Sequence, residues 1–102
     1  MTLRDWLAHR EPSPPRVLRE RIEALAASVP QDGGNPAATL VAAAELALVR
    51  LSSCTPDDRA TALDLLAADA LVTYAFELAS DSPDSIPGLS AAAMARLSAV
   101  AS

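Results

Sequence analysis

The chain has 102 residues, with 13 acidic and eight basic side chains and a formal net charge of −5. This length is enough for one domain, and an apolar content of 51% argues against a disordered chain. The acidic balance gives little support to a nucleic-acid surface. The longest uncharged runs, 33–44 and 85–95, are too short for a membrane span. Because the N-terminus lacks a secretory signal and the single Cys54 permits no intrachain disulfide, we expect a cytoplasmic protein.

Two helices are predicted in the first third of the chain, separated by prolines. The first covers residues 3–10 and ends before Pro12, since proline opposes the continuation of a helix. The second covers residues 14–29, with Pro14 in its first turn and apolar residues at spacings of three and four. Two prolines and two glycines then predict a loop over residues 30–36.

Three more helices are predicted beyond that loop. Asn35, followed by proline, begins a helix over residues 36–51. Thr55 is a capping residue followed by a proline and two acids, and it begins a helix over residues 56–79. Apolar spacing marks a last helix over residues 88–100. No segment has the alternation of a β-strand, so the predicted fold is all-α, with the 102 residues forming a single compact bundle of about five helices.

The helix over residues 56–79 is apolar nearly all round, which is typical of a helix at the centre of a bundle. Two acids, Asp69 and Glu77, lie on one side of it. A buried carboxylate needs a partner, because burial without one favours its neutral form. Arg50 and Arg96 are the candidate partners.

These acids have two interpretations. In the first, Asp69 and Glu77 form buried ion pairs or lie at an oligomer interface. In the second, they join Glu45 in a carboxylate cluster for metal binding or acid–base chemistry. We favour the first, because bundles that hold two metal ions bring Glu-x-x-His pairs that this chain lacks.

Few residues have the chemistry of a catalytic site. The chain has one histidine, His9, in a short terminal helix, so a catalytic triad is not expected. Cys54 precedes a helix start, where its thiol is either reactive or, as we favour, buried and inert. No phosphate-binding or metal-binding motif occurs in the sequence. We therefore expect no enzyme activity, no cofactor and no metal site.

The first predicted helix carries the only tryptophan, Trp6, on one face with Leu3 and Leu7. One interpretation is an interfacial membrane wedge. We favour a helix that folds back and covers the core, because so short a segment buries little apolar area and the rest of the chain is acidic.

Residues 65–80, LLAADALVTYAFELAS, are similar to the helix of trans-polyprenyl diphosphate synthases that reads LAGDALLTxAFELL, and residues 42–46 resemble that family's AxEL stretch. The chain departs from the family at Ala68, where the family has glycine. It also lacks the DDxxD motif and has no lysine for diphosphate. Prenyl-transfer chemistry is therefore not carried over. The resemblance implies a packing arrangement with an apolar slot beside Ala68, Ala75 and Phe76.

The sequence as a whole favours a non-enzymatic protein that acts through protein–protein interaction or self-association. With 23 alanines and 3% aromatic residues, a single copy has few large side chains for its core. A homodimer would cover the apolar helix over residues 56–79. The alternative is a binder of an apolar small molecule, such as an isoprenoid or lipid chain, as an inactive relative of the prenyl synthases.

Overall fold

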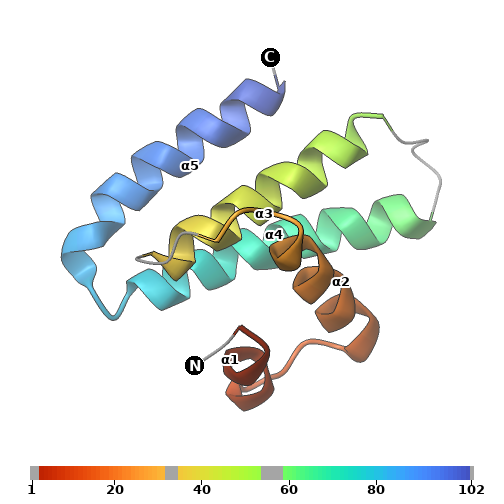
Figure 1. Ribbon diagram of the computed structural model, residues 1–102, viewed down its shortest axis with the longest axis horizontal. Coiled ribbons are helices and arrows are strands. Elements are labelled where there is room, and N and C mark those ends of the chain that lie inside the picture. The colour runs from red at the N-terminus through yellow and green to blue at the C-terminus, as the bar shows by residue number, and fades with distance from the viewer. Residues whose placement is uncertain (1–2, 32–34, 54–58, 102) are drawn as a thin grey trace.

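The computed structural model describes residues 3–31, 35–53 and 59–101 (Figure 1). Within these ranges all regular structure is helical, which confirms the all-α prediction. The elements are α1 (Leu3–His9), α2 (Arg16–Ala27), α3 (Pro36–Leu51), α4 (Arg59–Ala79), the 3₁₀ turn η1 (Pro83–Ser85) and α5 (Ile86–Ala101). The predictions for Cys54 and for a helix start at Thr55 and Pro56 concern residues outside these ranges.

The long helices α3 and α4 lie side by side and antiparallel at the centre of the molecule (Figure 1). The helix α2 packs across both of them, and α5 runs along α3 while also touching α4. The short α1 lies beside α2 at the N-terminal end. The described part of α4 therefore has neighbours on several sides, in agreement with its expected central position.

Two helix starts differ from the predicted ones for local reasons, while the ends of α1, α2 and α5 lie within two residues of the predicted ones. The helix α2 begins at Arg16 rather than residue 14. A residue before proline avoids helical backbone, so Pro14, which precedes Pro15, cannot open the helix. The helix α5 begins at Ile86 rather than residue 88, because the turn η1 leads directly into it. Pro87 is tolerated there, since the first turn of a helix needs no donor at that position.

The start of α3 is determined by a side-chain cap. The Asn35 side chain accepts a hydrogen bond of 3.1 Å from the Ala38 backbone N–H, which satisfies a donor that the helix itself leaves free. Pro36 follows in the first turn, where its fixed φ suits a helix. The structure thus begins α3 at the residue that the sequence predicts.

The core contains few large side chains. The largest that are fully buried are Leu7, Ile22, Leu25, Leu71 and Val41. Most other buried apolar residues are alanines, and on α3 and α4 these include Ala43, Ala44, Ala47, Ala67 and Ala75, all fully buried. Alanine permits close approach of the two helix backbones, but it supplies little apolar area per residue.

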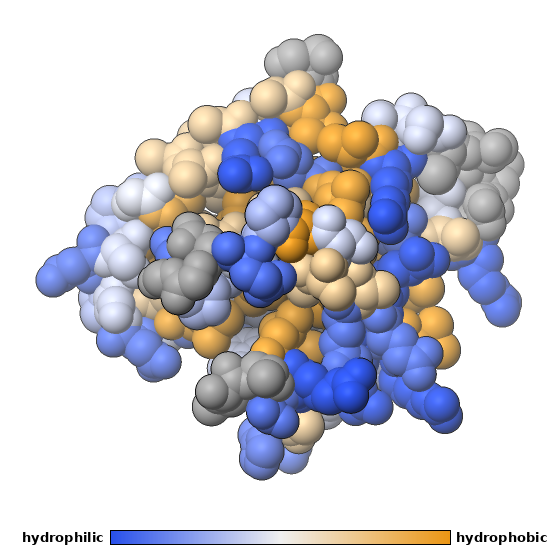
Figure 2. Space-filling view, viewed as in Figure 1, coloured by the Kyte–Doolittle hydropathy of each residue, from blue (hydrophilic) through white to orange (hydrophobic). Residues whose placement is uncertain are grey.

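The surface is mixed. Figure 2 shows hydrophobic residues exposed at several separate places among hydrophilic ones on the face it draws. The large apolar side chains that are well exposed are Val17, Val49, Leu65, Leu66 and Met94. Among the described residues, no helix has both the length and the apolar character needed to cross a membrane.

Candidate functional site

The helix α4 has one uncovered side, which we call the outer face of α4. It consists of Arg59, Ala62, Leu65, Leu66, Asp69 and Thr73, all exposed. Residues three and four apart share one side of a helix, so this set forms a single stripe. The opposite side of α4 is buried and carries Ala67, Leu71 and Ala75.

Leucine makes the outer face of α4 apolar at its centre. Leu65 is 58% exposed and Leu66 is 57% exposed. Single exposed leucines are common on protein surfaces, but two adjacent ones on the helix that is otherwise central are less expected. One base, Arg59, lies at one end of the stripe, and one acid, Asp69, lies near the other. These two charges are therefore separated by the leucines.

The structure separates the three acids that the sequence analysis grouped. Asp69 is exposed on the outer face of α4, so it is not a buried acid. Glu77 pairs with Arg10 rather than with Arg50 or Arg96. Glu45 accepts a hydrogen bond of 2.9 Å from Arg96.

The remaining candidate, Arg50, lies exposed near the end of α3. A catalytic carboxylate cluster of Glu45, Asp69 and Glu77 is not formed, because two of these acids engage separate arginines and the third is exposed.

The buried acid of α4 is Asp64, which the sequence analysis did not single out. Its side chain is only 8% exposed, and its Oδ1 lies 3.2 Å from Nε of Arg21 on α2. The two groups form an ion pair without the alignment of a hydrogen bond, and Oδ1 accepts no hydrogen bond from the described residues. Asp64 lies seven residues before the fully buried Leu71, on the same side of the helix.

The helix α1 folds back over the core, as predicted, with Leu7 fully buried and Trp6 reaching α4. The Trp6 ring meets Tyr74 edge-on, with ring centroids 5.3 Å apart. The guanidinium of Arg10 lies 4.6 Å from the centroid of the same Tyr74 ring, in cation–π geometry. Arg10 also donates two hydrogen bonds to Glu77, from Nε at 2.8 Å and from Nη2 at 2.5 Å. A bidentate pair of this kind fixes orientation as well as charge.

The pair between Arg10 and Glu77 predicts an acid-sensitive docking of α1. Hydrogen bonds from Arg10 lower the pKa of Glu77 below its ordinary value of 4.5, against the upward effect of partial burial. Because its pKa is lowered, the Glu77 carboxylate stabilises docking fully at pH values above its ordinary pKa. This stabilisation is lost as the pH falls through the lowered pKa. Since Glu77 is 38% exposed, the effect is at most about 1 kcal/mol.

The fluorescence of Trp6, the only tryptophan, measures this docking. Glu77→Gln is expected to shift the emission to longer wavelength at neutral pH and to weaken the acid transition. Glu20→Gln is the control, because it removes a carboxylate from an exposed pair with Arg16 on α2. Equal spectra for Glu77→Gln and the unmodified chain would show that the pair does not hold α1.

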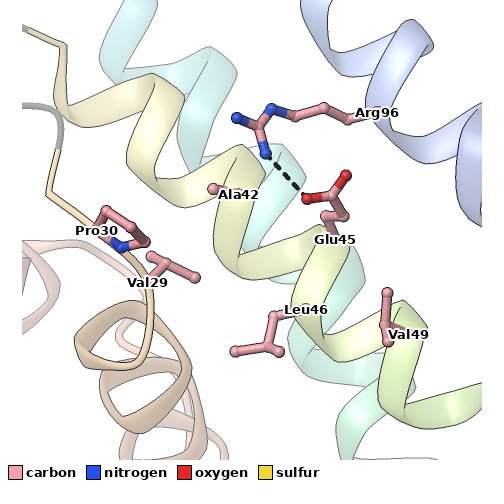
Figure 3. A pocket seen from close by; sticks show the side chains of 7 residues that line it. All are labelled: Val29, Pro30, Ala42, Glu45, Leu46, Val49 and Arg96. Carbon is pink, nitrogen blue, oxygen red and sulfur yellow. Dashed lines mark hydrogen bonds and ion pairs between the residues drawn. The ribbon is translucent and has the colours of Figure 1, made fainter.

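A groove of about 370 Å³ lies between the end of α2, α3 and α5 (Figure 3). The ion pair of Glu45 and Arg96 lies on one side of it. The other lining residues are Val29, Pro30, Ala42, Leu46 and Val49.

The groove does not coincide with the apolar slot that the sequence predicted beside Ala68, Ala75 and Phe76. Ala68 and Ala75 are buried in the core, and Phe76 packs against it. Neither these two alanines nor Phe76 lines the groove. Close packing of α4 against its neighbours thus occupies the place where the sequence suggested space for a ligand.

Among the described residues, no three His, Cys, Asp or Glu side chains are grouped closely enough to hold a metal ion. Comparisons of the chain with protein-family models, with curated proteins and with solved structures find no match.

Proposed function

We propose that the protein is a non-enzymatic helical module that acts by self-association, with the outer face of α4 as its interface. The observation that carries this proposal is the exposure of the adjacent Leu65 and Leu66, 58% and 57%, on a helix whose other side lies in the core. A second copy placed on this face would remove both leucines from water.

The energetics of this contact are those of a weak dimer. Full burial of a leucine side chain contributes about 1.5–3 kcal/mol, and each copy supplies two that are already partly covered. Association itself costs about 4–15 kcal/mol in lost freedom of motion. The four leucines of a pair therefore contribute less than about 6–12 kcal/mol, a sum of the same size as this cost, so we expect a weak dimer that assembles as the concentration rises.

Native mass spectrometry and sedimentation velocity test this proposal between about 1 μM and 1 mM. The unmodified chain is expected to form a dimer over this range. Leu66→Glu is expected to raise the dissociation constant at least about tenfold, because it places two carboxylates in the buried contact. Met94→Glu is the control, since Met94 is 68% exposed on α5, away from this face. A chain that stays monomeric throughout, or a dimer that Leu66→Glu leaves intact, would contradict the proposal.

A second candidate function is the binding of an apolar small molecule in the groove between α2, α3 and α5. Its volume of about 370 Å³ lies within the range of small-molecule sites, and five of its seven lining residues are apolar. The ion pair of Glu45 and Arg96 could orient a polar head group. Added mass of one isoprenoid or fatty-acid chain per copy in the same native spectra would favour this function over self-association alone.

A further inference from the structure

We propose that two copies of the chain pair through the outer face of α4 in antiparallel orientation, with Arg59 of each copy opposite the partner's Asp69. This inference rests on the proposed self-association and adds its geometry. The orientation follows from the order of residue types along the outer face of α4.

The residues Arg59, Ala62, Leu66, Asp69 and Thr73 recur at alternating spacings of three and four. This spacing produces a continuous stripe on one side of a helix, with the geometry of the a and d positions of a coiled coil. All five residues are exposed, so the stripe has no cover within the described part of the chain. A second helix of the same kind fits this shape.

The stripe is complementary to itself in one antiparallel arrangement. When the pair is centred at the level of residue 64, Arg59 and Asp69 lie equally far from the centre on opposite sides, and so do Ala62 and Leu66. Arg59 then faces the partner's Asp69, and Ala62 faces the partner's Leu66. Both contacts occur twice, as two-fold symmetry requires. The first of these contacts joins a base with an acid, and the second joins a small side chain with a large one.

Other arrangements lack this match. A parallel pair in register places Arg59 against the partner's Arg59 and Asp69 against the partner's Asp69, and like charges across an interface are unfavourable. An antiparallel pair centred on Leu66 places Arg59 opposite the partner's Thr73 and leaves both charges without a counterpart. The ion pairs lie at the rim of the contact, where they add little affinity but select the orientation.

Charge reversal at the two positions tests the orientation. Arg59→Asp and Asp69→Arg are each expected to raise the dissociation constant at least about tenfold at low salt, because each converts two attractive contacts into repulsive ones. The double variant R59D/D69R exchanges the two charges and retains the original net charge, so it is expected to dimerise as the unmodified chain does. Arg16→Asp is the control for net charge, since Arg16 is exposed on α2.

A mixture of the two single variants tests whether these charges meet across the interface. One variant is acidic at both positions and the other is basic at both, so only a mixed dimer contains two attractive pairs. Native mass spectra are expected to show mixed dimers almost exclusively. If Leu66→Glu abolishes the dimer while neither charge reversal affects it, the orientation is wrong and the proposed interface stands. If Leu66→Glu also leaves the dimer intact, both the interface and the orientation are wrong.

Discussion

Replacing Arg21 with Ala is expected to lower the free energy of unfolding by about 3–5 kcal/mol, because it leaves a buried carboxylate without its counter-ion. The carboxylate is that of Asp64, 8% exposed, and the Arg21 side chain that faces it is 30% exposed. The Oδ1 atom accepts no hydrogen bond from the described residues, so it depends on Arg21 for stabilisation. Removal of the guanidinium would therefore destabilise the folded state, in which the carboxylate is buried without an opposite charge.

Urea unfolding measures this loss, and two further variants define its origin. Arg21→Leu combined with Asp64→Leu is expected to recover most of the stability, because replacing a buried pair with apolar residues is often neutral or favourable. Arg16→Ala is the matched control on the same helix, since it breaks an exposed pair with Glu20 and should cost less than about 1 kcal/mol. If Arg21→Ala costs no more than Arg16→Ala, the buried pair is not a determinant of stability.

The features that could be predicted from the sequence are those with local causes. The cap at Asn35 and the proline after it define the start of α3 without reference to the rest of the molecule. The all-α class follows from spacing alone. The start of α2 at Arg16 also has a local cause, because Pro15 disfavours helical backbone at the residue before it.

The identity of the buried acid required tertiary information. A helix that is apolar nearly all round has no unique inner side, so its sequence does not say whether Asp64 or Asp69 faces the core. The answer depends on where α2 and α3 pack. They cover the side that carries Asp64 and Leu71 and leave Asp69 in the outer face.

The partner of Glu77 required long-range information as well. Arg10 is 67 residues away in sequence and meets Glu77 only because α1 folds back onto α4. The sequence indicated that fold-back through Trp6, but not which side of α4 would receive it. The role of Ala68 and Ala75 also required tertiary information. A row of small residues predicts that something packs closely against the helix, but the sequence does not say whether this is another helix or a ligand.

Leu71→Ala is expected to lower the free energy of unfolding by about 2–5 kcal/mol, through lost apolar burial and the cavity it leaves. Leu71 is one of the few large side chains in the core, and it is fully buried on α4. We expect the upper half of this range, because the cost depends on how far the surroundings collapse into the cavity. The core is made largely of alanines such as Ala44 and Ala75, and alanine has no rotatable side chain with which to fill space.

The measurement is again urea unfolding, where a lower midpoint at an unchanged slope reports a change in stability. Met94→Ala is the control, since Met94 is 68% exposed and its truncation should change stability by less than about 0.5 kcal/mol. A total stability of about 5–15 kcal/mol is usual for a domain, so the loss at Leu71 would be a large share of it. If Leu71→Ala costs no more than Met94→Ala, α4 does not pack at the centre of the core. In that case the exposure of Leu65 and Leu66 would no longer indicate an interface, because α4 would not be a buried helix.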